Sequence, residues 1–468
     1  MAPETLEKRI ASGRDPVAGL LGDAATVLDS EFAALPIMEQ SFDLAAMERV
    51  LVETAHRLGD NYPYFHPMYA GQMLKPPHPV ARAAYALAMK INPNNHAWDG
   101  GRASSQMEIE AVAEIARMFG WTDYLGHLTS SGTLANLEAL WAAGQIDPGK
   151  RTVGSEQAHY THHRISGVLK IEYESVAADA QGRMDLNALE DELKRGNVGT
   201  VVVTLGTTAI GAVDPLAQIL PLRERYGFRI HVDGAYGGYF RLIPDSLDAP
   251  ARAAFAVIDQ ADSIVIDPHK HGLQPYGCGC VLFRDPGVGR LYKHDSPYTY
   301  FTSKQLHLGE ISLECSRAGA AAVALWATQR LLPLQPDGEF AQGLKQGRAA
   351  ALELDRRLRS NARFRPLAGG EPELDIVVWK LAEAAERDAS AAAREVFAAC
   401  AHRNLHLALV QLPRPWFEAG ANPEGASQRE MVTCLRSVLM KPEHLEWLDR
   451  IWQVFCEACD EALGPRAG

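Results

Sequence analysis

The sequence has no long apolar run and no basic cluster, and each absence excludes a class of protein. Across its 468 residues, no apolar run approaches the ~18 residues that a membrane-spanning helix needs. The N-terminal residues MAPETLEKRIASGRD are polar and mixed in charge, without the apolar core of a signal peptide. The formal net charge is −12, whereas a nucleic-acid partner would need a cationic face. We therefore expect a cytoplasmic protein with no membrane or nucleic-acid partner.

The seven cysteines do not form the pattern of a disulfide framework, because their number is odd and their positions are scattered. Cys456 and Cys459 have metal-binding spacing, but they lie in an apolar helical pattern without a second pair. His159 and His163 have the i, i+4 spacing of zinc ligands, without the glutamate of an HExxH motif. We expect no metal site, and a histidine cluster at this point remains the alternative.

Length and the order of elements predict two domains after a helical N-terminal segment. The chain is longer than one core usually holds, and its hydrophobic content of 47% is ample for buried cores. Strand-like and helix-like runs alternate from about residue 125 to 285, which predicts an α/β fold with a mostly parallel sheet. We assign residues 1–60 to helices packed on the body or on a second subunit, 61–335 to a large domain and 336–468 to a small α+β domain.

The stretch Ser263–Cys280 carries the most distinctive chemistry of the chain. Its apolar start predicts a short buried strand, which ends at Asp267 and Pro268 because proline cannot continue a central ladder. His269 and Lys270 follow at the mouth of that strand, and glycines come after them, so the chain must turn tightly there. Burial lowers the pKa of a lysine, and a neutral amine is a nucleophile toward carbonyl groups. A lysine on an exposed loop tip is the other interpretation of this pattern.

A second strand-like run, Phe228–Phe240, contains Asp233 where the apolar residues end. A carboxylate at the end of a buried strand costs free energy unless it meets a cation. The protonated ring nitrogen of pyridoxal phosphate is such a cation, and a carboxylate beside it lets the ring act as an electron sink. The order Asp233, Ala235 and Lys270 is that of pyridoxal-phosphate enzymes with the aspartate-aminotransferase fold.

Several other polar residues also follow predicted strands. Ser131, Gly132 and Thr133 stand where a strand turns into a helix, and free N–H groups at a helix start favour an anion. An ordinary Ser/Thr helix cap explains any one of them equally well. Ligands of parallel sheets gather at the carboxyl ends of the strands. The residues that fall just after strands are Thr133, His159, Thr208, Asp233 and Lys270.

The motifs HVDGAYGG and DPHKHG together resemble the group II amino-acid decarboxylases, which include the aromatic-amino-acid, glutamate and archaeal tyrosine/aspartate decarboxylases. The resemblance implies a fold-type I pyridoxal-phosphate enzyme in which Lys270 forms the internal Schiff base and Asp233 holds the pyridine nitrogen. It implies that His159 and Ala235 lie on the two faces of the ring and that Thr208 lies beside the cofactor. It assigns the phosphate to Ser131, Gly132, Thr133 and His269.

The resemblance implies further residue roles, and local sequence patterns predict two helix caps. A loop in the region Gly287–Leu313 would form a lid whose tyrosine returns a proton; Tyr298 and Tyr300 are both candidates, and we prefer Tyr300. Candidates for the substrate pocket are Phe65, His66, Tyr69, His96, Trp98 and Arg102. Arg317 would pair with a carboxylate or cap the lid, and Asp214 is expected to cap a helix. Ser104 or Ser105 should cap a helix that spans Met107–Gly120.

The predicted function is decarboxylation of an L-amino acid to an amine and CO₂ by a homodimeric pyridoxal-phosphate enzyme with its active site at the subunit interface. The aromatic residues of the pocket loop mildly favour an aromatic substrate, and Arg102 and Arg317 leave an acidic one open. The residues GLQPYGCG after Lys270 differ from those of the aromatic-amino-acid enzymes. Two alternatives stay open, namely an aldehyde-forming C–C lyase of the sphingosine-phosphate lyase type and a metal or binding protein without this cofactor.

Overall fold

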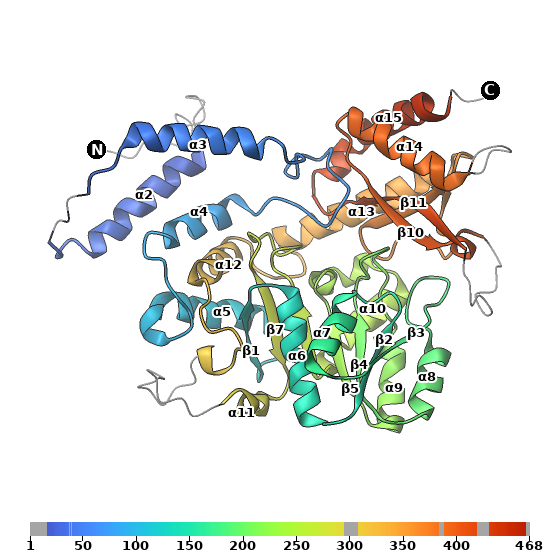
Figure 1. Cartoon of the computed structure of the whole chain (residues 1–468), viewed down its shortest axis with the longest axis horizontal. Coiled ribbons are helices and arrows are strands. Elements are labelled where there is room, and N and C mark those ends of the chain that lie inside the picture. Colours follow the sequence, from blue (N-terminus) through green and yellow to red (C-terminus); the bar gives the residue numbers. More distant parts are fainter. Residues whose placement is uncertain are drawn as a thin grey trace.

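The computed structural model describes residues 16–36, 38, 40–293, 308–382, 388–418 and 430–464, and it contains two sheets (Figure 1). The large sheet has seven strands in the order β1-β7-β6-β5-β4-β2-β3. Its strands are β1 (Leu125–Thr129), β2 (Arg151–Ser155), β3 (Tyr173–Val176), β4 (Val198–Thr204), β5 (Arg229–Asp233), β6 (Ser263–Ile266) and β7 (Gly279–Phe283).

Six of the seven strands run in the same direction. The pairs β3–β2, β2–β4, β4–β5 and β5–β6 are parallel, whereas β7 is antiparallel to both of its neighbours, β6 and β1. The chain between β6 and β7 contains no helix, and a parallel crossover usually needs one. The predicted mostly parallel α/β sheet is confirmed, and β7 is its one reversed strand. The carboxyl ends of β1, β2, β4, β5 and β6 therefore meet at one edge.

Helices cover both faces of this sheet, and every residue of β4 and β6 is buried, as is typical of parallel strands. Val202 of β4 packs against α6 and α7, whereas Val201 and Val203 point to the opposite side, where α5, α9 and α10 contribute to the core. The helices of this domain are α5 (Arg102–Met118), α6 (Gly132–Ile146), α7 (Thr161–Leu169), α8 (Leu186–Lys194), α9 (Leu216–Tyr226), α10 (Ala249–Ala256), α11 (Gly289–Tyr292) and α12 (Gly319–Leu331).

The second sheet is antiparallel, with the order β10-β11-β9-β8, and lies above the large sheet in Figure 1. Its strands are β8 (Phe364–Pro366), β9 (Ile376–Leu381), β10 (Ala408–Pro413) and β11 (Met431–Val438). The accompanying helices are α13 (Glu339–Arg359), α14 (Ala389–His402) and α15 (His444–Leu463). The sequence predicts an α+β domain here, with strands over Asp375–Lys380 and His406–Leu412 that correspond to β9 and β10 and helices that correspond to α13, α14 and α15, but its patterns do not show β8 and β11.

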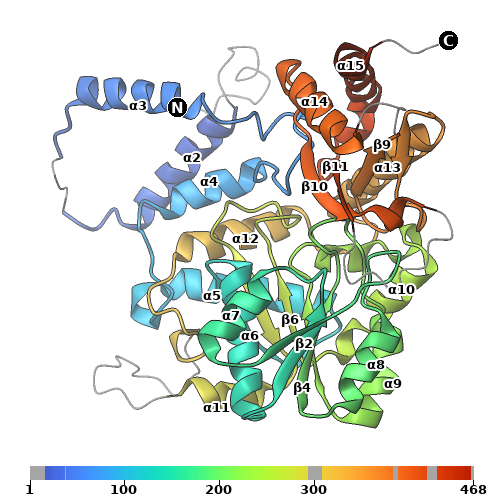
Figure 2. The ribbon, with the colours of Figure 1, turned by 45° about the vertical axis from the view of Figure 1, so that its right-hand side comes forward.

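The N-terminal segment stands apart from both sheets (Figures 1 and 2). It contains α2 (Pro16–Glu31) and α3 (Leu44–Leu58), neither of which has a buried residue, and α4 (Pro79–Ala88) follows. The side chain of Lys90 after α4 reaches Asp29 of α2 at 2.5 Å. Within the described ranges, no helix is both long and apolar enough to span a membrane.

Two predicted helix caps are wrong. Helix α5 begins at Arg102 with Gly101 as its N-cap, so Ser104 and Ser105 lie inside the helix. The hydroxyl of Ser104 instead donates to Oδ1 of Asn95 at 2.5 Å. The residue that precedes α9 is Pro215, and the carboxylate of Asp214 accepts the N–H groups of Thr204 and Met184 at 2.8 and 2.7 Å. Asp214 thus joins two chain segments, a role that sequence spacing does not reveal.

Candidate active site

One cavity of about 200 Å³ lies at the carboxyl ends of the parallel strands. Its lining includes each described residue to which the sequence assigned a role in cofactor binding or catalysis. These residues are Ser131, Gly132, Thr133, His159, Thr208, Asp233, Ala235, His269 and Lys270. Residues separated by as much as 139 positions in the sequence therefore share one small, mostly polar space.

Helix α6 points its N-terminus at this cavity. Ser131 is the N-cap, and its hydroxyl oxygen accepts the N–H of Leu134 at 3.2 Å. Among the described residues, the backbone N–H groups of Gly132 and Thr133 have no acceptor. Both residues line the cavity, so these two donors and the positive end of the helix dipole are available to an anion.

Asp233, the last residue of β5, is 5% exposed, and both of its carboxylate oxygens are occupied. Nε2 of His162 donates to Oδ2 at 2.8 Å, and the N–H of Ala235 donates to Oδ1 at 3.1 Å. Burial raises the pKa of Asp233, but the hydrogen bond from His162 and the positive charge of Lys270 outweigh this effect and hold that pKa below its ordinary value. The cavity therefore contains a buried ionised carboxylate.

His159 lies just before α7 and is only partly exposed at the cavity. Its Nδ1 accepts the N–H of Thr161 at 3.3 Å, so the ring proton of the neutral imidazole sits on Nε2. Burial lowers the pKa of His159, against the opposing charge of Asp233. The ring is thus neutral near pH 7. A neutral imidazole stacks on a positively charged ligand ring better than an imidazolium does.

Lys270 follows β6 with its ammonium 3.1 Å from Oδ2 of Asp267. The neighbouring His269 donates from Nδ1 to the carbonyl oxygen of Cys278 at 2.7 Å, and its ring lies 4.8 Å from that of Tyr276. Burial lowers the pKa of His269, so its ring is also neutral and its Nε2 is an acceptor. The side chain of Lys270 is 22% exposed, which leaves it within reach of a ligand in the cavity.

Sequence reasoning missed two residues that hold this site together. His162 is fully buried behind Asp233, and no sequence pattern assigned a role to this residue, which lies between the two histidines of the possible zinc pair. Arg436 of β11 is 4% exposed and donates to the carbonyl oxygen of Thr208 at 2.7 Å and to Oε1 of Gln72 at 3.2 Å. No local pattern marks Arg436, because its partners lie 228 and 364 residues away in the sequence.

The proposed pocket residues outside this cavity are dispersed. Arg317 is paired with Glu108, its NH1 lying 2.8 Å from Oε1, and the pair is buried. Tyr69 is buried, while Phe65 is 70% exposed and Arg102 is exposed on the first turn of α5. His66, His96 and Trp98 are partly exposed, and none of the six pocket candidates lines the cavity. Tyr298 and Tyr300 lie outside the described residues.

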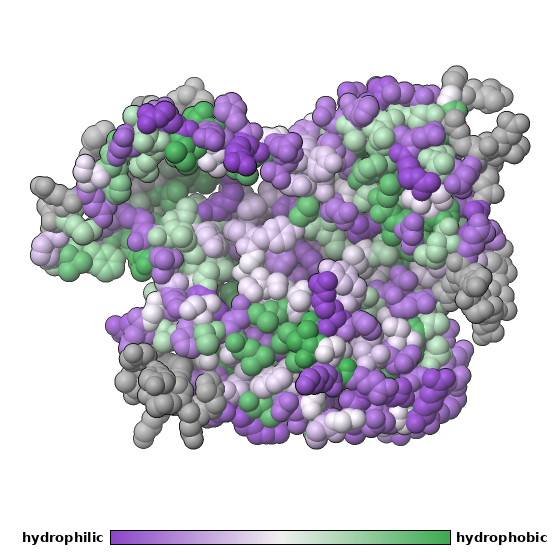
Figure 3. Space-filling model, viewed as in Figure 1, coloured by the Kyte–Doolittle hydropathy of each residue, from purple (hydrophilic) through white to green (hydrophobic). Residues whose placement is uncertain are grey.

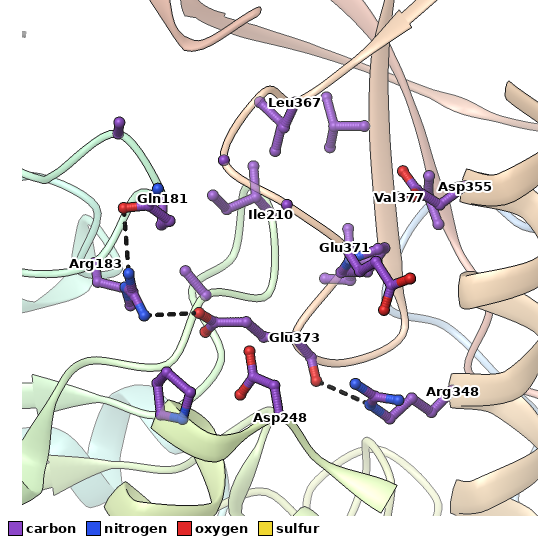
Figure 4. Close-up of a pocket in the computed structure, with 18 residues that line it drawn as sticks. Gln181, Arg183, Ile210, Asp248, Arg348, Asp355, Leu367, Glu371, Glu373 and Val377 are labelled. Carbon is purple, nitrogen blue, oxygen red and sulfur yellow. Dashed lines mark hydrogen bonds and ion pairs between the residues drawn. The ribbon is translucent and has the colours of Figure 1, made fainter. Parts of the chain in front are cut away.

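A larger cavity of about 410 Å³ lies between the large sheet's loops and the small domain, but its chemistry is different (Figure 4). Its acids include Glu373, whose carboxylate faces Arg183 at 3.4 Å and whose carbonyl oxygen accepts from Arg348 at 3.1 Å. Burial raises the pKa of Glu373 to about 8. None of the candidate site residues lines this space, so the smaller cavity is the candidate active site.

The smaller cavity fits pyridoxal phosphate. It offers two N–H groups at a helix start for a phosphate, an ionised carboxylate for a ring cation and a lysine for an aldehyde. Oδ1 of Asp267 is buried without a hydrogen-bond partner in the described part of the chain, so it can still accept a donor. Among the described residues, no group of three or more histidine, cysteine or acidic side chains is placed to hold a metal ion.

The fold is that of a fold-type I α/β enzyme, and this cavity is its candidate pyridoxal-phosphate site. The model of the pyridoxal-dependent decarboxylase conserved domain matches residues 62–382 of the chain. The protein therefore belongs to the pyridoxal-dependent decarboxylase family, and its cofactor is pyridoxal 5'-phosphate.

Several curated relatives are named as amino-acid decarboxylases. The chain is 29% identical to an L-tyrosine decarboxylase of Enterococcus faecium, over 62% of this chain and 64% of that protein. It is 26% identical to a probable L-tyrosine/L-aspartate decarboxylase of Methanothermobacter thermautotrophicus, over 66% of this chain and 82% of that protein. The chain thus spans less than two thirds of the Enterococcus protein's length.

Solved structures share the fold over nearly the whole chain. The tryptophan decarboxylase of Catharanthus roseus, solved with L-tryptophan, has a TM-score of 0.73 at 16% identity and covers 99% of this chain and 100% of its own. The TDC of Oryza sativa, solved with PLP and tryptamine, has a TM-score of 0.75 at 17% identity and covers 97% of this chain and 98% of its own. At these identities the likeness concerns the fold alone.

Proposed function

We propose that the protein decarboxylates an L-amino acid to the corresponding amine and CO₂ with pyridoxal phosphate as its cofactor. The observation that carries the proposal is the meeting of Lys270, Asp233, His159 and the start of α6 around one cavity. Each of these groups has a chemistry that the cofactor requires, and family membership supports the same reaction.

In this proposal different cavity residues bind different parts of the cofactor. Lys270 would hold the aldehyde end, and Asp233 the ring nitrogen. Ala235 and His159 would lie against the two faces of the ring, and Thr208 beside it. Ser131, Gly132 and Thr133 would bind the phosphate, and His269 would add a donor from Nε2 only as an imidazolium, because its Nδ1 proton is given to the carbonyl oxygen of Cys278.

When bound, pyridoxal phosphate supplies an electron-accepting ring that stabilises the charge left when the carboxylate departs. In the balanced reaction, the bond between Cα and the carboxylate carbon of the substrate breaks, CO₂ leaves, and one proton is added to Cα. We assign this proton to the hydroxyl of Tyr300, with Tyr298 as the other candidate. The hydrogen bond from His162 would keep Asp233 ionised beside the ring cation.

We infer that an aromatic substrate is favoured over an acidic one. An acidic side chain needs a cation in the site, and Arg317 is committed to Glu108 in a buried pair. Arg102 is exposed and does not line the cavity. The relatives named for L-tyrosine support the same preference, although one of them is also named for L-aspartate.

We also propose that the active enzyme is a homodimer. Helix α3 carries a row of apolar residues that the single chain leaves exposed, including Leu44 (72%), Val50 (61%) and Leu51 (63%). Figure 3 shows apolar residues gathered on this projecting segment. An exposed apolar stripe of this kind is typical of an interface, and a second copy of the chain is the occupant we propose. Light scattering of the purified protein should give twice the chain mass, and deletion of residues 1–60 should give the monomer mass.

The test of the proposed reaction uses the purified full chain with and without added pyridoxal phosphate. Common L-amino acids are screened for CO₂ release, and the products are separated as amine or aldehyde. We expect cofactor-dependent release of CO₂ and an amine, fastest with an aromatic substrate. Lys270→Ala should abolish turnover, whereas Lys194→Ala on the exposed face of α8 should not. Transamination alone, an aldehyde product or activity in the Lys270 variant would refute the proposal.

A further inference from the structure

The side chain of a fully buried histidine behind the cavity, His162, makes one hydrogen bond among the described residues, and its partner is Asp233. Nε2 of His162 lies 2.8 Å from Oδ2 of the carboxylate, and both side chains are nearly inaccessible, with side-chain exposures of 0% and 6%. In the described part of the chain, Nδ1 of His162 has no hydrogen-bond partner. A carboxylate oxygen only accepts hydrogen bonds when ionised, so the proton of a neutral His162 must sit on Nε2.

Few other groups stabilise the negative charge of the Asp233 carboxylate. Its Oδ1 accepts one backbone N–H, that of Ala235, and apart from this bond and the one from His162 the carboxylate has no hydrogen bond among the described residues. Burial of an ionised carboxylate costs several kcal/mol in general unless hydrogen bonds or charges compensate it. The titratable groups that face the pair are His159 before α7, His231 on β5, Tyr173 on β3 and Lys270 after β6.

Of these neighbours, His231 cannot replace His162 as the donor. Its two ring nitrogens are already engaged, Nδ1 with the hydroxyl of Ser263 at 2.9 Å and Nε2 with Oδ1 of Asn136 at 2.7 Å. Burial and the proximity of His162 lower the pKa of His231 to about 3, so its ring is neutral. Tyr173 carries no charge, because burial raises the pKa of its hydroxyl.

We propose that His162 is a positioning residue that keeps Asp233 ionised and turned toward the cofactor's ring nitrogen. His162 touches neither substrate nor cofactor in this assignment, since it does not line the cavity. It acts through Asp233, because the interaction of this carboxylate with a ring cation depends on the carboxylate's charge and orientation. The inference rests on the proposed function, because it assigns Asp233 to the cofactor's ring nitrogen.

A matched pair of substitutions separates the hydrogen bond from the packing. His162→Gln keeps an N–H donor at about the position of Nε2, whereas His162→Met has a similar length and no donor. His163→Met, at the exposed neighbouring position, is the control. We measure the dissociation constant of pyridoxal phosphate for the apoprotein of each variant from pH 5 to 8, together with the absorbance of the bound cofactor.

We expect His162→Met to weaken cofactor binding by about 10-fold or more and His162→Gln by less than about 3-fold, as is usual when the partner that orients a ligand-binding group is lost. The affinity of His162→Met should also fall more steeply between pH 8 and 5, because Asp233 without its donor takes up a proton at a higher pH. A purely structural histidine would change the affinity without changing its pH dependence. Equal affinities and equal pH dependences in the Gln and Met variants would overturn the proposal.

A second measurement does not depend on whether the His162→Met variant folds. In apoprotein with ¹⁵N-labelled histidine, the His162 signals are assigned by their loss in His162→Gln. A proton on Nε2 and none on Nδ1 would support the donor role, and the reverse would refute it. If the wild-type protein binds no pyridoxal phosphate at all, the proposed function fails instead, so the two failures are distinguishable.

Discussion

The ammonium of Lys270 lies 3.1 Å from Oδ2 of Asp267, three residues earlier in the chain. The same carboxylate stands against Gly132 at the start of α6, where a Cβ atom would meet both Asp267 oxygens at 2.5 Å. The strand that supplies the lysine and the helix that offers its N–H groups are therefore in direct contact. Gly132 is needed for this close approach, not for an unusual backbone angle.

Replacing Gly132 by alanine should disturb both stability and cofactor binding. The added methyl group displaces a buried carboxylate, and overpacking of this kind costs about 1–3 kcal/mol. We expect a lower denaturation midpoint and a cofactor affinity reduced by about 10-fold or more. Gly167→Ala on α7 is the control, because it has open space around its Cα and should gain about 0.5–1 kcal/mol. Unchanged cofactor binding in the Gly132 variant would contradict the contact.

Replacing Arg317 by methionine tests whether this arginine binds substrate or supports the fold. The guanidinium and Glu108 are both buried, so removing one partner leaves an uncompensated charge and should cost about 3–5 kcal/mol in the free energy of unfolding. Urea unfolding measures this loss. We expect the ratio of kcat/KM for aromatic and acidic substrates to stay unchanged in the protein that remains folded. A loss of kcat/KM with acidic substrates alone, at an unchanged free energy of unfolding, would show that Arg317 binds substrate.

Arg436→Met should loosen the loop that carries Thr208. The variant loses the hydrogen bonds to the Thr208 carbonyl oxygen and to Gln72, so the small domain no longer fixes this edge of the cavity. We expect the dissociation constant of pyridoxal phosphate, measured by absorbance titration, to rise by about 10-fold. Arg394→Met is the control. This variant removes an exposed arginine of α14 that donates to Thr433, a residue of β11 like Arg436, and it should leave the dissociation constant unchanged. Equal effects of both variants would argue against a role at the cavity.

The stability of the protein should rise with pH above neutrality because of Lys441. Burial, with the nearby charge of Lys75, lowers the pKa of Lys441 to about 7, whereas an unfolded lysine has a pKa of about 10.4. Below pH 7 the amine is protonated in both states. From about pH 7 to 10.4 the unfolded state binds more protons, so the free energy of unfolding rises by at most about 1.4 kcal/mol per pH unit.

Lys441→Met removes this contribution. We expect the difference in unfolding free energy between wild type and Lys441→Met to increase in favour of the wild type from pH 7 to pH 10, as measured by chemical denaturation. Lys194→Met, at an exposed position on α8, should follow the wild-type pH dependence. Parallel curves for wild type and Lys441→Met would show that this amine keeps an ordinary pKa.

Local sequence patterns were sufficient to predict most of the large domain. Continuous apolar runs such as that of β4 predict buried parallel strands, and each candidate cavity residue follows one of these strands or its turn. The caps at Ser104 and Asp214 were wrong because a serine or an aspartate near a helix start is equally able to bond to a distant segment. Strand β8 was missed because it has only three residues.

The sequence by itself indicated which residues meet at the carboxyl edge of the sheet, because each follows a predicted strand and parallel strands end at one edge. The strand order and the reversal of β7 appear only in the tertiary structure. Only the tertiary structure decided which partners surround them. The pairing of Arg317 with Glu108, the support of Asp233 by His162 and the contact of Arg436 with Thr208 join segments up to 228 residues apart. Such partners satisfy buried charges after the chain has folded, and no local spacing records them.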